Sequence, residues 1–376
     1  MMLSLTIEGA DLRDAATWVG RLCPVKHATP ILQGIMLDAA EELTLSAYDF
    51  ETAGTATIPA SVLSPGRALV SGRLLAAIAK TLDPKKDVTL TDESGTLSLT
   101  VGRNRWTLPG LSIEDYPQLP AVGETAAKLD AAALRRALER VLPAADRTTE
   151  QPLCGAVAVV SAGQRFAIVG LDRHRIAAAE IDCDGTEIDA LVPTGWLEAG
   201  IHVLAPGSAA AEFGATSAGV YLSCGSRTLT GRLVAAEWPS WRALLPSPDQ
   251  PVSAIFVVRD LLAAVDRVLA VADDERAVRL SVSADGFVIE SIDDRGSVNA
   301  EALVSEYEGE PKMTAVKPKY LRDALNTMQS DLAVMRAGDR SGAKLDFVPL
   351  DENGEPVTDY RHIVMPMDPK KLVSRL

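Results

Sequence analysis

The segment Asp11 to Pro24, DLRDAATWVGRLCP, decides the fold because its pattern returns twice more along the chain. Its apolar residues recur at the three- and four-residue spacing of an amphipathic helix. The next segment, Ile31 to Ile58, alternates apolar and polar residues at strand spacing around turn-forming acids. A second helical segment, Ser71 to Leu82, and a second strand group, Asp87 to Leu108, follow. The order of this unit is therefore helix, strands, helix, strands.

The same order appears in the middle third and in the last third of the chain. In the middle third the pattern predicts helices at 130–146 and 193–204 and strands at 153–181 and 209–234. In the last third it predicts helices at 257–273 and 317–328 and strands at 277–303, 332–350 and 361–367. Because unrelated α+β proteins also mix helices and strands, the shared order is the informative observation.

The repeat period sets the domain organisation. It is about 120 to 130 residues, which is the size of a domain rather than of a solenoid repeat. We therefore predict an α+β protein of three similar domains, at residues 1–124, 125–249 and 250–376.

Composition narrows the class of protein. The chain has 376 residues, of which 47% are hydrophobic and 23% charged, and no apolar run approaches the roughly 18 residues of a membrane span. The N-terminal stretch lacks the basic flank and apolar segment of a secretory signal, so we expect a folded cytoplasmic protein. Cys23, Cys154, Cys183 and Cys224 lie far apart without histidine pairs. This spacing favours free thiols over a metal site, and we expect no cofactor.

The net charge of −14 is unusual for a protein that binds nucleic acid, so any DNA contact must come from a locally basic face. Cations are frequent on the predicted helices, which suits helices that face a phosphate backbone. Lysine and arginine are also good helix formers at exposed positions, and this second explanation stays open. The helix cations are Arg13, Arg21, Arg73, Lys80, Arg135, Arg136, Arg140, Arg259, Arg267, Lys317, Lys319 and Arg322.

Seven short segments, in order along the chain, resemble the β subunit of bacterial DNA polymerase III, the processivity clamp. They are TPIL from Thr29, LSAYDFE from Leu45, DYPQLP from Asp115, LDRHRIA from Leu171, WPSWRALLP from Trp238, KPKYLRDAL from Lys317 and VMPM from Val364. The resemblance covers essentially the whole chain. It implies three clamp domains, each with two helices packed on antiparallel sheet, and a head-to-tail homodimer that closes a ring around double-stranded DNA without reading its sequence.

The resemblance also implies partners and a binding site for them. Clamps bind the polymerase III catalytic subunit and clamp-loader subunits through short peptides with apolar anchors. The pocket for these peptides would comprise Leu153, Leu171, Asp172, Arg173, His174, Arg175, Ile176, Pro239, Ala243, Leu244, Tyr320, Ile363, Met365, Pro366 and Met367. The DNA contacts would comprise Lys26, Lys80, Arg147, Thr148, Gln151 and Pro152. For Leu153, Ile176 and Leu244 ordinary core packing is an alternative explanation, and for the DNA residues a solvated surface position is an equal one.

The chain departs from the family pattern at the predicted pocket. Arg173 stands where clamps usually have glycine, a residue that backbone freedom or peptide access could require. Ala243 and Glu150 stand where arginine is common, and Asp368 to Leu376 extend beyond the usual end. The extension could fold over the pocket or remain a basic end.

Two other functions compete with a replicative clamp. An enzyme is one, because Asp172 and His174 superficially suggest acid–base chemistry, but the four histidines fall in four separate segments and no hydrolase or nucleotide-binding motif is present. We therefore expect a non-catalytic processivity factor. The second is a scaffold or decoy with the clamp fold that binds partner peptides or antibiotics without being loaded on replicating DNA.

Overall fold

The computed structural model describes residues 3–26, 29–146, 151, 153–204, 207, 210–217, 219–270, 277–293, 296–340 and 342–367, without the side chains of 292–298. The predicted order of helix, strands, helix, strands repeats three times. Each repeat also opens with a strand that the sequence analysis did not predict: β1, β10 and β18. All six predicted helical segments contain a helix, so the α+β class is confirmed.

The elements of the first repeat are β1 (Ser4–Glu8), α1 (Gly9–Leu22), the 3-10 helix η1 (Pro30–Gln33), β2 (Gly34–Ala39), β3 (Leu43–Tyr48), β4 (Thr52–Ile58), β5 (Ser61–Ser64), β6 (Gly66–Ser71), α2 (Gly72–Thr81), β7 (Asp87–Glu93), β8 (Thr96–Val101) and β9 (Asn104–Pro109). Those of the second are β10 (Ala127–Asp130), α3 (Ala131–Val141), the 3-10 helix η2 (Leu142–Ala144), β11 (Ala156–Ala162), β12 (Arg165–Leu171), β13 (Arg175–Gly185), β14 (Ile188–Pro193), α4 (Thr194–Ile201), β15 (Ala210–Thr216), β16 (Gly219–Cys224) and β17 (Arg227–Gly231).

The third repeat follows the short helix α5 (Trp241–Leu244). Its elements are β18 (Val252–Val257), α6 (Val258–Leu269), β19 (Val278–Ser283), β20 (Gly286–Asp293), β21 (Gly296–Ala302), β22 (Val304–Glu308), β23 (Lys312–Val316), α7 (Pro318–Asn326), β24 (Leu332–Ala337), β25 (Leu345–Pro349) and β26 (Tyr360–Val364).

The chain divides into two compact units. Unit 1 comprises Met1–Ala132, Asp184–Ile188 and Trp196–Leu233, and unit 2 comprises Ala133–Cys183, Asp189–Gly195 and Val234–Leu376. The middle third of the sequence contributes to both units. The domain boundaries at 124 and 249 therefore stay a prediction.

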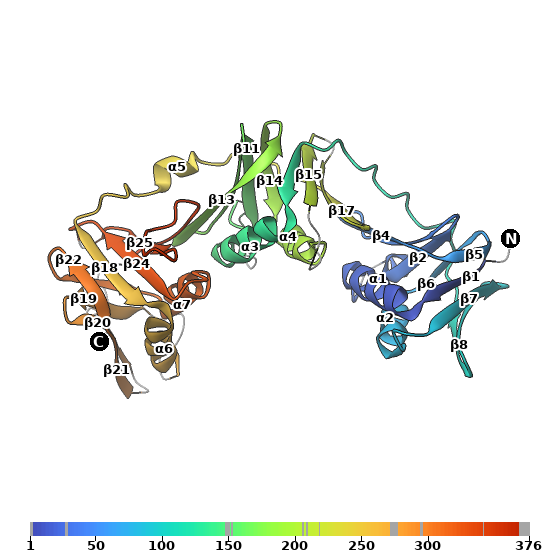
Figure 1. Ribbon diagram of the computed structural model, residues 1–376, viewed down its shortest axis with the longest axis horizontal. Coiled ribbons are helices and arrows are strands. Elements are labelled where there is room, and N and C mark those ends of the chain that lie inside the picture. Colours follow the sequence, from blue (N-terminus) through green and yellow to red (C-terminus); the bar gives the residue numbers. More distant parts are fainter. Residues whose placement is uncertain are drawn as a thin grey trace. The chain divides into compact units, whose positions relative to one another are not determined.

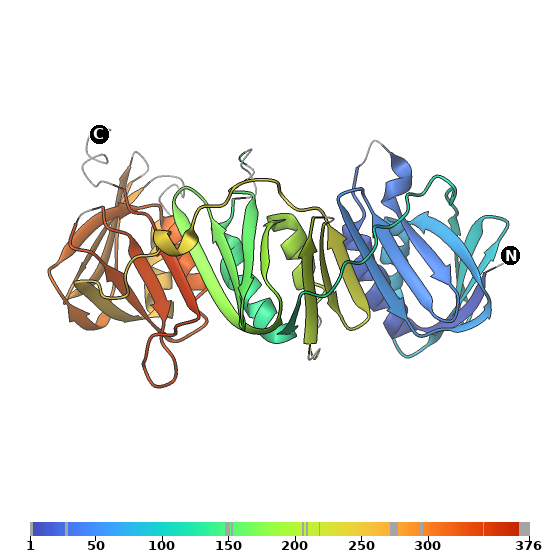
Figure 2. The same cartoon turned by 90° about the horizontal axis from the view of Figure 1, so that it is seen from above.

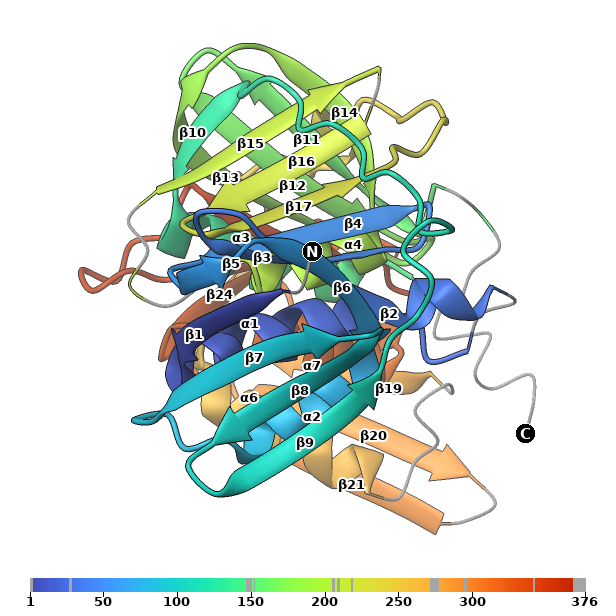
Figure 3. The ribbon, with the colours of Figure 1, turned by 90° about the vertical axis from the view of Figure 1, so that its right-hand side faces the viewer.

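Unit 1 contains two antiparallel sheets and the paired helices α1 and α2 (Figure 1). The five-stranded sheet has the order β5-β1-β7-β8-β9, and β9 is one of its two edge strands (Figure 3). The other sheet runs β6-β2-β3-β4-β17-β16-β15-β10. The segment 110–126 crosses the face of this sheet opposite the helices (Figure 2), and Met36, Arg67 and Tyr116 line the groove beneath it.

Helix α1 buries one face because its apolar residues follow the helical period. Leu12, Ala15, Ala16 and Val19 are buried at the i, i+3, i+4, i+7 spacing. A Cβ added to Gly20 would lie 2.8 Å from the Cβ of Ala76 in α2. The glycine therefore allows the two helices to approach closely.

Unit 2 also contains two antiparallel groups of strands, with α6 and α7 packed together. The larger group runs β11-β12-β13-β26-β25-β24-β18, and β22 also pairs with β18. A four-stranded sheet has the order β21-β20-β19-β23, so β21 and β23 are its two edges. Figure 1 labels β19, β20 and β21 of this sheet. In β18 and β19 buried and half-buried residues alternate strictly, which is the pattern of a strand that covers a core with one face.

Candidate partner-binding site

A cluster of buried apolar side chains lies where β12, β13 and β26 meet in unit 2. Leu171, Ile176 and Ile363 belong to it, together with Trp241 from α5. Leu244, Trp238, Val234 and Leu245, from the segment that precedes β18, pack against it while half-buried. The cluster therefore has a partly exposed apolar rim formed by this connecting segment.

The turn between β12 and β13 borders this cluster and is ordered by one carboxylate. Asp172 Oδ1 accepts hydrogen bonds from the backbone N–H groups of His174 (2.7 Å) and Arg175 (2.9 Å). Arg173, at the tip, is exposed and does not have a positive φ. The expectation that this position needs the backbone freedom of glycine is therefore wrong, since the Asp172 hydrogen bonds hold the turn in a conformation open to any residue.

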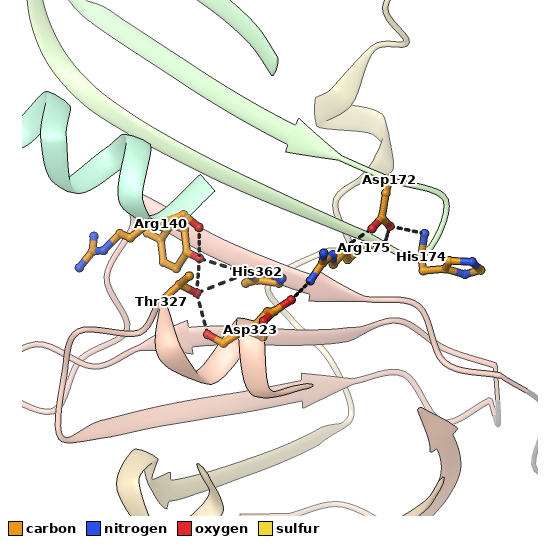
Figure 4. Close-up of polar contacts among 9 residues, drawn as sticks. Arg140, Asp172, His174, Arg175, Asp323, Thr327 and His362 are labelled. Carbon is orange, nitrogen blue, oxygen red and sulfur yellow. Dashed lines mark hydrogen bonds and ion pairs between the residues drawn. The ribbon is translucent and has the colours of Figure 1, made fainter. Parts of the chain in front are cut away.

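Arg175 fixes this turn to α7, as Figure 4 shows. Its side chain is 7% exposed, and its guanidinium donates to Asp172 Oδ2 (2.9 Å) and to Asp323 Oδ2 (2.5 Å). The same group lies 4.7 Å above the ring of Tyr320, which stacks with His174 at 5.5 Å. A buried arginine between two carboxylates gives the turn a defined position relative to α7.

The chain after β26 closes the other side of the turn. The backbone N–H of Met365 donates to the carbonyl oxygen of His174 at 2.7 Å. Met367 and Ala315 exchange backbone hydrogen bonds of 2.7 and 3.3 Å, which places Met367 beside the edge strand β23. The side chain of Met365 is exposed. An apolar, flexible side chain thus lies next to His174 and Tyr320 at the surface.

The connecting segment before β18 is held by three cations. Arg242 pairs with Glu180 on β13 (2.6 Å), Lys344 donates to the carbonyl oxygen of Leu244, and Arg361 donates to that of Pro246 (2.8 Å). Arg361 also pairs with the fully buried Asp346 at 2.5 Å. Burial raises the pKa of Asp346, and the paired arginine opposes this shift. The backbone around Leu244 is therefore fixed from β25 and β26.

A second polar group lies beneath the turn and joins α3, α7 and β26 (Figure 4). The Tyr360 hydroxyl lies 2.7 Å from Thr327 Oγ1, 3.2 Å from His362 Nδ1 and 3.1 Å from the carbonyl oxygen of Arg140. His362 is fully buried, and among the described residues its Nε2 has no hydrogen-bond partner. Burial, and secondarily the charge of Arg175, lower the pKa of His362 to about 3.

This histidine predicts an acid-sensitive contribution to stability. Its pKa is lower in the folded protein than the ordinary value of 6.5, so its contribution is complete above pH 6.5 and is lost as the pH falls toward 3. Each pH unit is worth about 1.36 kcal/mol. Because His362 becomes protonated in the unfolded chain first, we expect it to lower the free energy of unfolding by about 2 to 3 kcal/mol between pH 6.5 and pH 4.5.

The measurement is urea unfolding at both pH values for the wild type and for His362→Gln. Every other titrating group, including Asp346, is shared by the two proteins, so the difference between their pH dependences isolates the histidine. An equal loss of stability in both proteins would show that His362 becomes protonated without penalty.

The structure brings most of the predicted pocket residues together at three levels of exposure. The buried residues, which form the floor, are Leu171, Arg175, Ile176 and Ile363. The half-buried residues are Leu153, Asp172, His174, Leu244, Tyr320, Pro366 and Met367. The exposed residues are Arg173, Pro239, Ala243 and Met365. Leu153 is not part of the described apolar cluster. Trp238 and Asp323 lie in two of the family-like segments but were not predicted as site residues, and Thr327 and Tyr360 lie outside those segments. The roles of all four depend on contacts between distant segments.

The predicted DNA residues are described only in part. Lys80 is exposed in the last turn of α2, and Lys26 is exposed after α1. Gln151 is exposed, and its side-chain oxygen lies 3.7 Å from the Cys154 sulfur. Arg147, Thr148 and Pro152 lie outside the described residues, as do Glu150 and 368–376. Of the other helix cations, Arg135 pairs with Glu139 at 3.0 Å, and Arg140 lies 5.0 Å above the Tyr360 ring.

Comparisons with known proteins identify the family. The model of the DNA polymerase III beta subunit N-terminal domain matches residues 3–120, and that of the C-terminal domain matches residues 242–345. The chain belongs to the DNA polymerase III beta subunit family. The beta sliding clamp of Micrococcus luteus is 31% identical over 286 residues, which cover 74% of this chain and 91% of that protein. The beta sliding clamp of Streptomyces coelicolor is 27% identical over 97% of this chain and 99% of its own.

Two further similarities concern a clamp homologue and a ligand. The beta sliding clamp homolog GriR of Streptomyces muensis is 26% identical over 96% of this chain and 98% of its own. A DnaN sliding clamp from Pseudomonas aeruginosa, solved bound to griselimycin, superposes with a TM-score of 0.88 at 21% identity, covering 98% of this chain and 100% of that one. This structural likeness confirms the sliding-clamp fold.

Proposed function

We propose that two copies of this protein close head to tail into a ring around duplex DNA, and that the ring tethers the replicative polymerase and other partners. One observation carries the proposal: in a chain of the beta subunit family, the order strand, helix, strands, helix, strands occurs three times. Three such repeats per chain supply six to a two-chain ring. A closed ring also removes free sheet edges, which otherwise invite pairing with foreign strands.

The proposed dimer contact joins β9 of one subunit to β21 of the other. Both are edge strands of their sheets among the described residues. Arg103 and Arg105, at and beside β9, are exposed, whereas β21 carries the exposed Glu301. Leu303, directly after β21, is 76% exposed and can add an apolar contact. The two edges are therefore complementary in charge.

The DNA contact is proposed for the helices of unit 1. Lys80 on α2 and Lys26 after α1 would bind phosphates, which gives weak affinity without sequence preference. The doubly substituted protein Lys26→Ala, Lys80→Ala is expected to bind linear duplex with a salt dependence, log K against log salt, that is less steep by about 1 to 2. Fluorescence anisotropy over a salt series measures this slope.

Lys128→Ala is the matched control for that measurement, because Lys128 is exposed on the strand β10 of the same unit. Its slope should equal that of the wild type. An unchanged slope in the double variant would contradict a DNA-facing role for α1 and α2.

The proposed site for partner peptides is the surface formed by Leu244, Tyr320 and Met365 beside the buried residues Leu171, Ile176 and Ile363. Short peptides from the polymerase III catalytic subunit and from clamp-loader subunits would place apolar anchors on it. The flexible Met365 suits a site that accepts several related peptides.

We also propose that the protein acts in the cytoplasm and without catalysis. Asp172 and His174, the pair that suggested acid–base chemistry, are engaged in ordering the turn and in stacking on Tyr320. Among the described residues, no three potential metal ligands lie close enough together to hold an ion. Within the described part of the chain, no helix is long and apolar enough to cross a membrane.

A clamp-fold scaffold or decoy is the second candidate function. The similarity to a clamp homologue and to a clamp solved with griselimycin supports it. The two candidate functions differ in their expected effect on the processivity of the polymerase. With clamp loader and polymerase III, a replicative clamp lengthens the products of single binding events on a singly primed circular template, whereas a scaffold binds peptide but leaves product length unchanged.

A further inference from the structure

The groove beneath the segment 110–126 of unit 1 is a cavity that neither the proposed ring nor the partner site of unit 2 uses. Its volume is about 830 Å³, within the roughly 300 to 1,000 Å³ that is typical of ligand pockets. The floor is one face of β2, β3, β4 and β6, the turn 40–42 closes one end, and the segment 113–119 forms the wall. Figure 2 shows this segment crossing the sheet face.

The floor of the groove combines apolar and polar side chains at positions that strand pairing fixes. Side chains alternate along a strand, so Met36 and Asp38 line the groove while Leu37, between them, is fully buried on the other face. Met36 pairs with Ser46 on β3, and Asp38 pairs with Thr44. The apolar position of the floor is therefore two residues further from the turn 40–42 than the acidic one.

Ser46 supplies a hydrogen-bonding group that the protein leaves unused. This residue is 3% exposed and lines the groove, and among the described residues its hydroxyl makes no hydrogen bond. The neighbouring hydroxyls of Thr44 and Thr57, in contrast, bond to each other at 3.1 Å. A buried hydroxyl without a partner is unfavourable, so Ser46 favours a ligand with a polar group, such as the backbone of a peptide.

The turn between β2 and β3 makes one end of the groove acidic. Asp38 is paired with Arg67 at 2.7 Å. Glu41 and Glu42 are exposed, and within the described part of the chain neither carboxylate has an ion pair or a hydrogen bond. Three carboxylates against one guanidinium leave two negative charges in excess in the lining. This excess repels a DNA phosphate and attracts a lysine or arginine side chain.

The length of β3 sets the spacing between the two ends of the groove. Glu42 directly precedes β3, four residues before Ser46 and its partner Met36. Four residues of a strand span about 13 Å, at about 3.3 Å per residue, and an extended peptide has the same rise. A peptide with an apolar side chain beside Met36 would therefore place a residue about four positions away at the acidic turn.

We propose that this groove binds a short, extended, basic segment of a partner protein. An apolar side chain of that segment packs beside Met36, its backbone bonds to Ser46, and lysines or arginines pair with Glu41 and Glu42. The chain's own segment 368–376 is also basic, but it follows Met367, which is paired with Ala315 of unit 2, whereas the groove is built from unit 1 alone. A segment of another protein is therefore the occupant.

The test uses the full-length protein and fluorescent synthetic peptides in both chain directions. One peptide has a leucine, three threonines and two lysines in that order, a second has the reverse order, and each has a counterpart with glutamine in place of lysine. At low salt we expect the wild type to bind at least one lysine peptide about three- to tenfold more tightly than its counterpart, since two exposed ion pairs contribute modestly. This preference should fade at about 0.5 M salt, which screens exposed charges. Fluorescence anisotropy measures the affinities.

Variants of the groove separate its charge from its hydroxyl. Glu41→Gln, Glu42→Gln should bind lysine and glutamine peptides equally. The matched control Glu51→Gln, Glu93→Gln has the same change in net charge at exposed positions of unit 1 outside the groove, and it should keep the preference. Ser46→Ala should bind both kinds of peptide about two- to tenfold more weakly, because a neutral hydrogen bond is lost.

Three results would overturn the proposed interaction. A preference for lysine that is absent from the wild type, or that survives in Glu41→Gln, Glu42→Gln, contradicts the role of the acidic turn. Failure of every peptide to bind the wild type contradicts the groove as a peptide site. A protein truncated after Met367 should bind as the wild type does; if it binds the lysine peptides much more tightly, the chain's own segment 368–376 is the occupant instead of a partner.

Discussion

Replacement of both Arg103 and Arg105 by glutamate is expected to make the protein monomeric at concentrations where the wild type is a dimer. These residues lie at the edge strand β9, and the proposed partner edge β21 carries Glu301. The substitution turns attraction into repulsion within the proposed contact, and like charges placed opposite each other in an interface cost several kcal/mol. We expect the dimer dissociation constant to rise by about 100-fold or more, equivalent to about 3 kcal/mol. Sedimentation velocity over a concentration series measures it.

Two further variants test whether the loss of the dimer is specific to the charges at β9. Glu301→Arg in the same chain should restore part of the affinity, since the charges are exchanged rather than lost. The variant Arg13→Glu, Arg73→Glu has the same change in net charge, at exposed positions of α1 and α2, and should remain dimeric. A double variant at β9 that dimerises as tightly as the wild type would show that this edge lies outside the subunit contact.

Replacement of Arg175 by alanine should damage both stability and peptide binding. It leaves Asp172 and Asp323 without their shared counterion, at side-chain exposures of 8% and 23%. Removing one partner of such a buried pair costs about 3 to 5 kcal/mol. The turn that carries His174 then loses its attachment to α7, and we expect peptide affinity to fall by more than about 30-fold. Urea unfolding and fluorescence anisotropy measure the two effects.

Two further variants separate the geometry of Arg175 from its charge. Arg175→Lys keeps the charge but has one nitrogen in place of the separate nitrogens that donate to Asp172 and Asp323, so its losses should be intermediate. Arg242→Ala breaks the exposed pair with Glu180 and should cost less than about 1 kcal/mol. If Arg175→Ala unfolds at the wild-type urea concentration, the buried bridge contributes nothing to the fold.

The repeat could be predicted from sequence because the spacing of apolar residues within each segment indicates a helix or a strand. The buried face of α1 follows from the spacing of Leu12, Ala15, Ala16 and Val19, and β19 follows from the alternation of apolar and polar residues within the predicted strand segment 277–303. Strand β18, before the predicted helix at 257–273, was not predicted. The sequence could not indicate which strands are adjacent. The pairing of β13 with β26, which underlies the candidate partner-binding site, joins residues almost 200 positions apart, such as Arg175 and Val364.

The residues of the site could be predicted by carrying them over from the family that the sequence resembles. The contacts that position them were not, because they join distant segments. Arg175 reaches Asp323, 148 residues away, and Tyr360 reaches the carbonyl oxygen of Arg140, 220 residues away. The interpretation of Arg173 also needed the structure, since only the hydrogen bonds of Asp172 show that an arginine fits the turn without strain.

Retention on DNA tests the central claim most directly. The protein is assembled on nicked circular DNA with a clamp loader, the salt is raised, and half of the sample is linearised before gel filtration. A ring is held by topology, so we expect it to remain on circles at a salt concentration that abolishes phosphate contacts and to slide off the linear DNA. Equal loss of protein from circular and linear DNA would contradict encirclement and favour the scaffold.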